Sequence, residues 1–362
     1  MKMHRILVAD DSSFMRHLIK RYVEEDPEIQ VVGEAKNGEE AIAETLRLRP
    51  DVITMDVEMP GMDGLTALSE IMARRPTPVI MLSSFQKFGD AEIVMALQRG
   101  AVDFVAKPSG ELSADLYKVK SELCEKIKNA AGAPIKRLLK LAGLTQAEAP
   151  PQPLSLLPLL RNARLRTASV VNELVAIGTS TGGPQALTVL LKGLPASFPH
   201  PIVIVQHMPA PFTASLAHRL DAVSALKVVE AKNGQQLANG TVFIAPGDSH
   251  MNVEEKEGSY WIKLHQKPIA GLHRPSVDEL FRSIMALGRL KRHLVLLTGM
   301  GSDGAEQMLR ARNAGQAATT IAESKETCIV YGMPRAAVER GIVDYVLPIE
   351  QISKKLLEII SG

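Results

Sequence analysis

Short apolar runs that alternate with helical patterns are the feature that most limits how this chain can fold. The runs at Ile6–Ala9 and Val79–Leu82 contain only apolar residues, and segments with a helical period follow them at Ser12–Glu25 and Asp90–Arg99. Continuous apolar strands that alternate with helices are typical of parallel sheets covered on both faces. The same alternation resumes from Glu173 to the end of the chain. The pattern therefore predicts two doubly wound α/β domains, the second mostly parallel with one hairpin near Glu254–Leu264.

A proline-rich stretch separates the two alternating regions. The chain has 362 residues, more than one ordinary domain needs. The segment Ala147–Pro153 contains three prolines within Pro150-Pro151-Gln152-Pro153, which exclude a helix or a central strand. We therefore expect a first domain over residues 1–123, a tether over 124–169 and a second domain over 170–362.

Composition excludes several classes of function. The net charge is +2, which gives no strong case for nucleic acid as a partner. The two cysteines, Cys124 and Cys328, make neither a disulfide framework nor a zinc pattern. The N-terminus does not resemble a signal peptide, and no apolar run is long enough to cross a bilayer. We expect a cytoplasmic protein without a transmembrane segment.

Polar residues follow the predicted strands of the first domain at the points where the strands end. The carboxyl ends of parallel strands meet at one edge of the sheet, so these side chains should converge. Clustered carboxylates suit Mg²⁺, and a lysine with a hydroxyl beside them suits a transferred phosphoryl group. A capping role explains each acid singly but not the whole group. The residues at these ends are Asp10, Asp11, Asp56, Ser83 and Lys107.

These residues resemble the receiver domain of two-component response regulators, which has a flavodoxin-like fold. The match includes an Asp-x-x-Met-Pro-x-Met-Asp-Gly run that begins at Asp56, and a Lys107-Pro108 pair. The resemblance implies that Asp56 accepts a phosphoryl group from a chemotaxis histidine kinase. It also implies Mg²⁺ bound by Asp11, Asp56 and the Glu58 carbonyl, with Asp10 acting through water. Ser83 and Lys107 would contact the phosphoryl oxygens, and Phe104 would be the aromatic switch residue.

Three turns of the second domain carry groups that could form a hydrolytic site. Ser180 lies in a glycine-rich turn after an apolar run, His207 follows another such run, and Asp303 lies in a third, glycine-rich turn. A nucleophilic serine needs a base, and the base needs an acid that fixes its tautomer. Their order along the chain differs from that of α/β-hydrolases, so the turn around Ser180 does not indicate that fold.

Other interpretations of these turns remain open from the residues alone. The loop Gly178–Gly183 could hold a nucleotide phosphate in a domain that only binds, although it has neither a Walker lysine nor GxGxxG spacing. Asp303 could cap the helix that begins near Gly304, and His207 could be a core or capping residue. The rival bases are His200, His250, His265 and His273.

The second domain also resembles the catalytic domain of the CheB protein-glutamate methylesterase family. The matching segments are Gly178–Pro184, Gln206–Pro209, Ala245–Asp248, Thr298–Gly304 and Tyr331–Pro334. The resemblance implies hydrolysis of glutamyl methyl esters, and deamidation of some glutamines, on methyl-accepting chemotaxis receptors. Ser180, His207 and Asp303 would be catalytic, Thr181 and the Met300 N–H would bind the oxyanion, and no organic cofactor would be needed. We further predict that the unphosphorylated receiver covers the Ser180 cleft.

Overall fold

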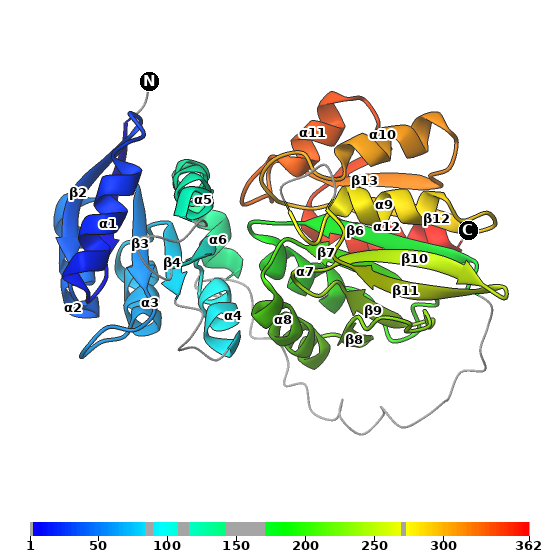
Figure 1. Ribbon diagram of the computed structural model, residues 1–362, viewed down its shortest axis with the longest axis horizontal. Coiled ribbons are helices and arrows are strands. Elements are labelled where there is room, and N and C mark those ends of the chain that lie inside the picture. The colour runs from blue at the N-terminus through cyan, green and yellow to red at the C-terminus, as the bar shows by residue number, and fades with distance from the viewer. Residues whose placement is uncertain (1–2, 84–89, 108–115, 142–170, 269–272, 362) are drawn as a thin grey trace.

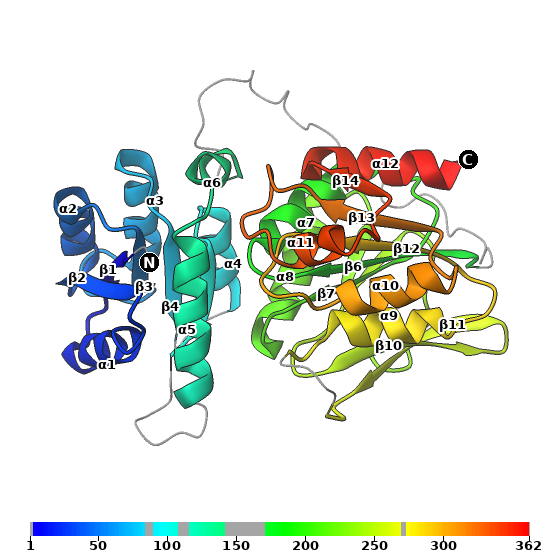
Figure 2. The same cartoon turned by 90° about the horizontal axis from the view of Figure 1, so that it is seen from above.

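A computed structural model describes residues 3–83, 90–107, 116–141, 171–268 and 273–361. Two α/β units lie side by side (Figures 1 and 2). None of the helices in the described part of the chain has the length and apolar character that a membrane crossing requires.

The first unit is a five-stranded parallel sheet with the strand order β2-β1-β3-β4-β5. This order confirms the predicted flavodoxin-like winding. Its central strands are buried along their whole length. The strands are β1 (His4–Ala9), β2 (Ile29–Ala35), β3 (Val52–Asp56), β4 (Val79–Ser83) and β5 (Asp103–Ala106). The helices are α1 (Ser13–Val23), α2 (Gly38–Leu48), α3 (Gly64–Arg74), α4 (Asp90–Gln98) and α5 (Leu116–Ala130).

Helix starts in this unit are fixed by side-chain caps and by one close approach. Ser12 and Asp63 accept hydrogen bonds from the backbone N–H groups of Met15 and Thr66, the usual way to satisfy free donors at a helix N-terminus. A Cβ on Gly64 would lie 2.0 Å from the Asp56 carbonyl oxygen. Only glycine therefore lets α3 begin directly against the end of β3.

The second unit is a seven-stranded sheet, parallel throughout, with the order β14-β13-β12-β6-β7-β9-β8. Helices cover both of its faces. The strands are β6 (Glu173–Thr179), β7 (Ile202–Gln206), β8 (Lys227–Glu230), β9 (Thr241–Ile244), β12 (Lys291–Leu296), β13 (Thr319–Glu323) and β14 (Tyr345–Leu347). The helices are α7 (Gly183–Lys192), α8 (Ala210–Val223), α9 (Val277–Met285), α10 (Ala305–Asn313), α11 (Met333–Glu339) and α12 (Ile349–Ser361).

An antiparallel hairpin, β10 (His250–Lys256) and β11 (Ser259–His265), packs outside this sheet. It confirms the one hairpin that the sequence predicted. Its turn is formed by Glu257 and Gly258, both with positive φ. Strand β8 was not predicted, because its short sequence Lys-Val-Val-Glu has too few apolar residues to stand out.

Two helices belong to the region between the sheets. Helix α5 continues to Ala130, beyond the boundary expected at Leu123, and α6 covers Ile135–Leu141. Arg137 of α6 is buried and forms an ion pair with Glu350 at the start of α12. Helix α6 is therefore anchored to the second unit. The proline-rich stretch of the expected tether lies outside the described residues.

The two units meet chiefly through α4 of the first and α7 and α8 of the second, and β5 adds side-chain contacts (Figure 2). The Gln185 amide on α7 donates to the carbonyl oxygens of Leu97 and Ala101, at 2.6 and 3.1 Å. Phe104 meets Phe212 of α8 edge-on, with ring centroids 4.8 Å apart. Such aromatic pairs contribute about 0.5–1.5 kcal/mol beyond the area they bury. The interface thus combines apolar packing with buried hydrogen bonds.

Candidate active site

Three neighbouring strands bring the predicted catalytic residues to one edge of the seven-stranded sheet. Strand β6 lies between β12 and β7. Ser180 directly follows β6, His207 directly follows β7, and Asp303 lies in the turn between β12 and α10. Because all three strands are parallel, their carboxyl ends share this edge. The prediction that these residues gather at adjacent strand ends is confirmed.

His207 and Asp303 are joined by a short hydrogen bond. Its length is 2.8 Å between His207 Nε2 and Asp303 Oδ2, and the two side chains are 6% and 15% exposed. Burial tends to raise the pKa of Asp303, but the hydrogen bond and charge of His207 and backbone N–H groups outweigh it and lower that pKa to about 2. The ionised carboxylate only accepts hydrogen bonds, so Nε2 carries the ring proton. Nδ1 is therefore the basic nitrogen.

Nδ1 of His207 is buried and has no hydrogen-bond partner among the described residues. The Ser180 hydroxyl likewise forms no hydrogen bond with His207 in the described part of the structure. The histidine–aspartate half of the predicted triad is therefore formed, whereas the hydrogen bond from Ser180 to His207 is not. Catalytic hydrogen bonds are often long in free enzymes and tighten only when substrate is bound.

Asp303 also caps a helix, though not the helix that the sequence suggested. Its carboxylate accepts hydrogen bonds from the N–H groups of Val277 and Asp278 at the start of α9, at 2.7 and 2.9 Å. Asp278 in turn accepts from the N–H groups of Gly304 and Gln307 at the start of α10. The alternative that Asp303 caps α10 is wrong, because Asp278 occupies that position. The two acids cap each other's helices, which holds Asp303 rigidly.

The turns around Ser180 and Met300 present the expected oxyanion donors. The Ser180 N–H donates to the Thr298 carbonyl oxygen at 3.0 Å. A Cβ on Gly299 would lie 2.8 Å from the Ser180 Cβ, so the two turns approach as closely as glycine allows. In the described part of the chain the backbone N–H groups of Thr181 and Met300 have no acceptor. Both are available to a developing oxyanion.

The first unit lies directly on this site. The Thr181 hydroxyl, one residue beyond the nucleophile, donates to Asp103 Oδ2 at the start of β5, and Thr181 is only 4% exposed. Met300 packs against a core cluster that includes residues of the first sheet. Asp103 directly precedes Phe104 on β5, whereas the cluster against Met300 includes Val105, on the other face of the sheet from Phe104. We had not identified Asp103 from the sequence, because it lies inside a strand pattern.

Among the described residues only His207 forms an ion pair with Asp303, whereas the rival His265 lies 3.4 Å from Glu279. His250 is buried, and burial together with the nearby His265 lowers its pKa to about 4. His200 lies near Glu173, at the start of β6 and so at the opposite end of the sheet. His273 stacks on the His207 ring, with centroids 4.1 Å apart and an angle of 18° between the planes. His273 supports the face of the base and does not replace it.

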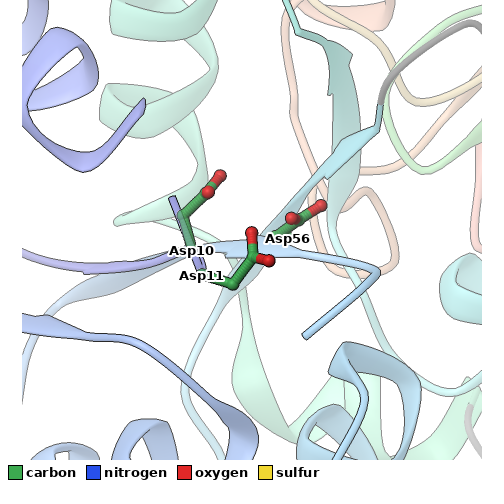
Figure 3. A group of neighbouring side chains, drawn as sticks. All are labelled: Asp10, Asp11 and Asp56. Carbon is green, nitrogen blue, oxygen red and sulfur yellow. The ribbon is translucent and has the colours of Figure 1, made fainter. Parts of the chain in front are cut away.

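A second cluster lies at the carboxyl edge of the first sheet. Asp10 and Asp11 follow β1, Asp56 ends β3, and one oxygen of each lies within 4.8 Å of the others (Figure 3). Lys107 Nζ lies 2.6 Å from both Asp10 Oδ2 and Asp56 Oδ2. Burial, offset in part by Lys107, raises the pKa of Asp56 to about 6. Three carboxylates facing one ammonium leave excess negative charge, so the donor set fits a hard divalent cation.

The remaining predicted receiver residues surround this cluster. Ser83 ends β4, and its buried hydroxyl has no partner among the described residues. Glu58 is exposed in the loop after β3. Phe104 is buried against Phe212, so the predicted switch residue touches the second unit directly. Sequence analysis placed all these residues at one edge but could not show that contact between the units.

Comparisons with known proteins agree with both units. The family profile described as CheB methylesterase matches residues 175–356, and that of the response regulator receiver domain matches residues 6–116. A protein-glutamate methylesterase/protein-glutamine glutaminase from Geobacillus kaustophilus is 45% identical over 99% of both chains. One of the same name from Thermotoga maritima is 42% identical over 98% of both chains.

The solved structures include the catalytic domain of the Thermotoga maritima CheB methylesterase. It is 43% identical with a TM-score of 0.51, and the match covers 52% of this chain and all of that domain. The CheB methylesterase match over residues 175–356 contains Ser180, His207 and Asp303. This chain belongs to the CheB methylesterase family and carries an N-terminal response regulator receiver domain.

Proposed function

We propose that this chain is a phosphorylation-regulated protein-glutamate methylesterase that also deamidates glutamines. The observation that carries the proposal is the buried His207–Asp303 hydrogen bond on the strand ends that flank Ser180. The names of the full-length relatives supply the reaction, and the geometry supplies a serine mechanism for it.

In the first half of the reaction, Ser180 Oγ attacks the ester carbonyl while His207 Nδ1 accepts its proton. The Asp303 carboxylate stabilises the imidazolium through Nε2–H. The backbone N–H groups of Thr181 and Met300 stabilise the oxyanion, and loss of one such donor typically costs about 3–4 kcal/mol. Collapse of the intermediate breaks the ester C–O bond, and the imidazolium returns the proton to give methanol.

In the second half, water attacks the acyl-enzyme with His207 again as the base. The bond from Ser180 Oγ to the acyl carbon breaks, Ser180 recovers its proton, and a free glutamate side chain leaves. A glutamine side chain follows the same route with ammonia in place of methanol. We propose that the substrates are methylated glutamates of methyl-accepting chemotaxis receptors, in keeping with the family.

The first unit supplies the regulatory input. We propose that Asp56 accepts a phosphoryl group from a histidine kinase, with Lys107 and the unpartnered Ser83 hydroxyl binding the phosphoryl oxygens. Asp10, Asp11, Asp56 and the Glu58 carbonyl would hold Mg²⁺. The cation would neutralise charge on the transferred group. Asp56 carries the nucleophilic oxygen, and Lys107 compensates charge on its carboxylate.

The two functions are coupled through the interface. The receiver lies on Thr181 and packs Phe104 against Phe212, which supports the prediction that it covers the Ser180 cleft. We propose that phosphorylation of Asp56 loosens this contact. The esterase rate of residues 170–362 alone should exceed that of the unphosphorylated full chain, and equal rates would contradict inhibition by the receiver.

Methanol release from methylated receptor membranes tests the proposed activity. The wild-type chain should release methanol, and Ser180→Ala should not. Equilibrium dialysis with nucleotides tests the competing interpretation of the Gly178–Gly183 loop as a phosphate-binding turn. Nucleotide binding without methanol release would replace the esterase assignment by a binding function.

A further inference from the structure

Thr298 joins the two turns that would carry out the chemistry. Its carbonyl oxygen accepts hydrogen bonds from the Ser180 N–H at 3.0 Å and from the Thr179 hydroxyl at 2.8 Å. Its hydroxyl lies 2.9 Å from the Thr181 carbonyl oxygen, to which it donates. Thr298 also directly precedes Gly299 and Met300. The position of this one residue therefore sets both the nucleophile turn and the turn with the second oxyanion donor.

The side chain of Glu323 binds the backbone of Thr298. Glu323 is fully buried at the end of β13, and its Oε2 accepts the Thr298 N–H at 2.8 Å. Its other oxygen accepts the Thr327 hydroxyl at 2.9 Å. No lysine, arginine or histidine forms an ion pair with Glu323 in the part of the chain that the structure describes. Burial raises the pKa of this carboxyl to about 7.

The strand register shows why a side chain is needed at this point. The parallel ladder between β12 and β13 ends with Leu296 opposite Ala322. Beyond it the chain turns away toward Gly299, so no strand partner remains for the Thr298 N–H. Burial of a carboxyl group costs free energy, which its hydrogen bonds to the Thr298 N–H and the Thr327 hydroxyl must offset. Glu323 continues the ladder by one hydrogen bond past the end of the strand.

We propose that Glu323 is a positioning residue for the ester hydrolysis. By accepting the Thr298 N–H, it fixes the Ser180 and Met300 turns relative to each other. It touches neither the substrate nor His207, and it acts through Thr298 alone. This inference rests on the proposed esterase function and deepens it.

According to the proposal, kcat depends on the length of the side chain at position 323 and not on its charge. Glu323→Gln keeps the length of the side chain and an oxygen that accepts from Thr298, so its kcat should stay within about threefold of wild type. Glu323→Asp keeps the acid but withdraws it by one methylene, and Glu323→Ala removes it. Both should lower kcat by about 10- to 100-fold with KM changed less than twofold, as expected for misplaced catalytic groups.

The control is Thr320→Val. Thr320 lies on the same strand, is equally buried, and bonds to Ile342 and Asp344, which belong to no part of the site. All variants are made in the full chain, phosphorylated so that the site is accessible, and compared by methanol release and by thermal melting. Thr320→Val should lose stability without losing kcat. Glu323→Asp provides the test if Glu323→Ala does not fold.

The inference is overturned if Glu323→Asp and Glu323→Ala keep wild-type kcat, if Glu323→Gln loses as much kcat as they do, or if Thr320→Val loses as much. A rise in KM with kcat unchanged in Glu323→Asp and Glu323→Ala also overturns it. Ser180→Ala separates this failure from failure of the proposed function. A wild type that releases methanol beside an inactive Ser180→Ala upholds the esterase whatever Glu323 does, whereas an inactive wild type rejects both.

Discussion

Removal of the Asp103 carboxylate should release the esterase from the unphosphorylated receiver. Asp103 accepts a hydrogen bond from the Thr181 hydroxyl across the interface, in a place where both side chains are buried. A hydrogen bond to a charged group contributes about 1.5–3 kcal/mol. If that energy favours the closed form alone, Asp103→Ala raises the open-to-closed ratio by roughly ten- to a hundredfold, since 1.4 kcal/mol is tenfold. Asp103→Asn, which keeps a neutral acceptor, should give a smaller rise.

The assay is methanol release by the full chain without a phosphodonor. The basal rate of Asp103→Ala should rise toward that of residues 170–362, and the further gain on phosphorylation should shrink by the same factor. Asp26→Ala is the matched control, because Asp26 pairs with Lys128 inside the receiver and forms no hydrogen bond or ion pair with the described residues of the second unit. An unchanged basal rate for Asp103→Ala, alongside a fast isolated domain, would refute the role of this hydrogen bond.

Three further predictions concern the two sites. Ser180→Ala should lower methanol release on the order of 10⁶-fold and Asp303→Asn on the order of 10⁴-fold, while both still accept phosphate at Asp56, as followed by intact-protein mass. The folded-state pKa of Asp56, about 6, lies above the ordinary 3.8, so its contribution to stability is present at low pH and is lost as pH rises through 6. In metal-free urea titrations Asp56→Asn should therefore gain about 1.4 kcal/mol on wild type between pH 5 and pH 8, and a constant difference would contradict the raised pKa. Chelation with EDTA should stop phosphorylation of Asp56 and leave methanol release by residues 170–362 unchanged. If EDTA lowered methanol release by residues 170–362, the esterase site itself would need a metal.

Strand ends were the part of the site that the sequence predicted best. Ser180, His207 and Asp303 each follow an apolar run, and parallel winding alone requires such positions to share an edge. The same reasoning placed Asp10, Asp56 and Lys107. Both sheets and the hairpin were predicted for the same reason, because buried strands leave continuous apolar runs that polar turns interrupt.

What the sequence did not predict depends on register and on contacts between the two units. Glu323 does not stand out in the sequence, and its role is visible only because the ladder ends at Leu296, two residues before Thr298. Asp103 lies within a strand and meets Thr181 only because the units dock. The helix that Asp303 caps depends on where α9 packs, which no local pattern specifies.

The capping of α9 and α10 gives Asp303, the proposed partner of His207 in catalysis, a structural role as well. Asp303 accepts hydrogen bonds at the start of α9 and Asp278 accepts them at the start of α10, so displacement of either side chain loosens the start of a helix. A substitution that changes the acidity of Asp303 therefore also changes the hydrogen bonds that begin α9, so the chemistry of the site and the stability of the fold cannot be altered separately at this residue.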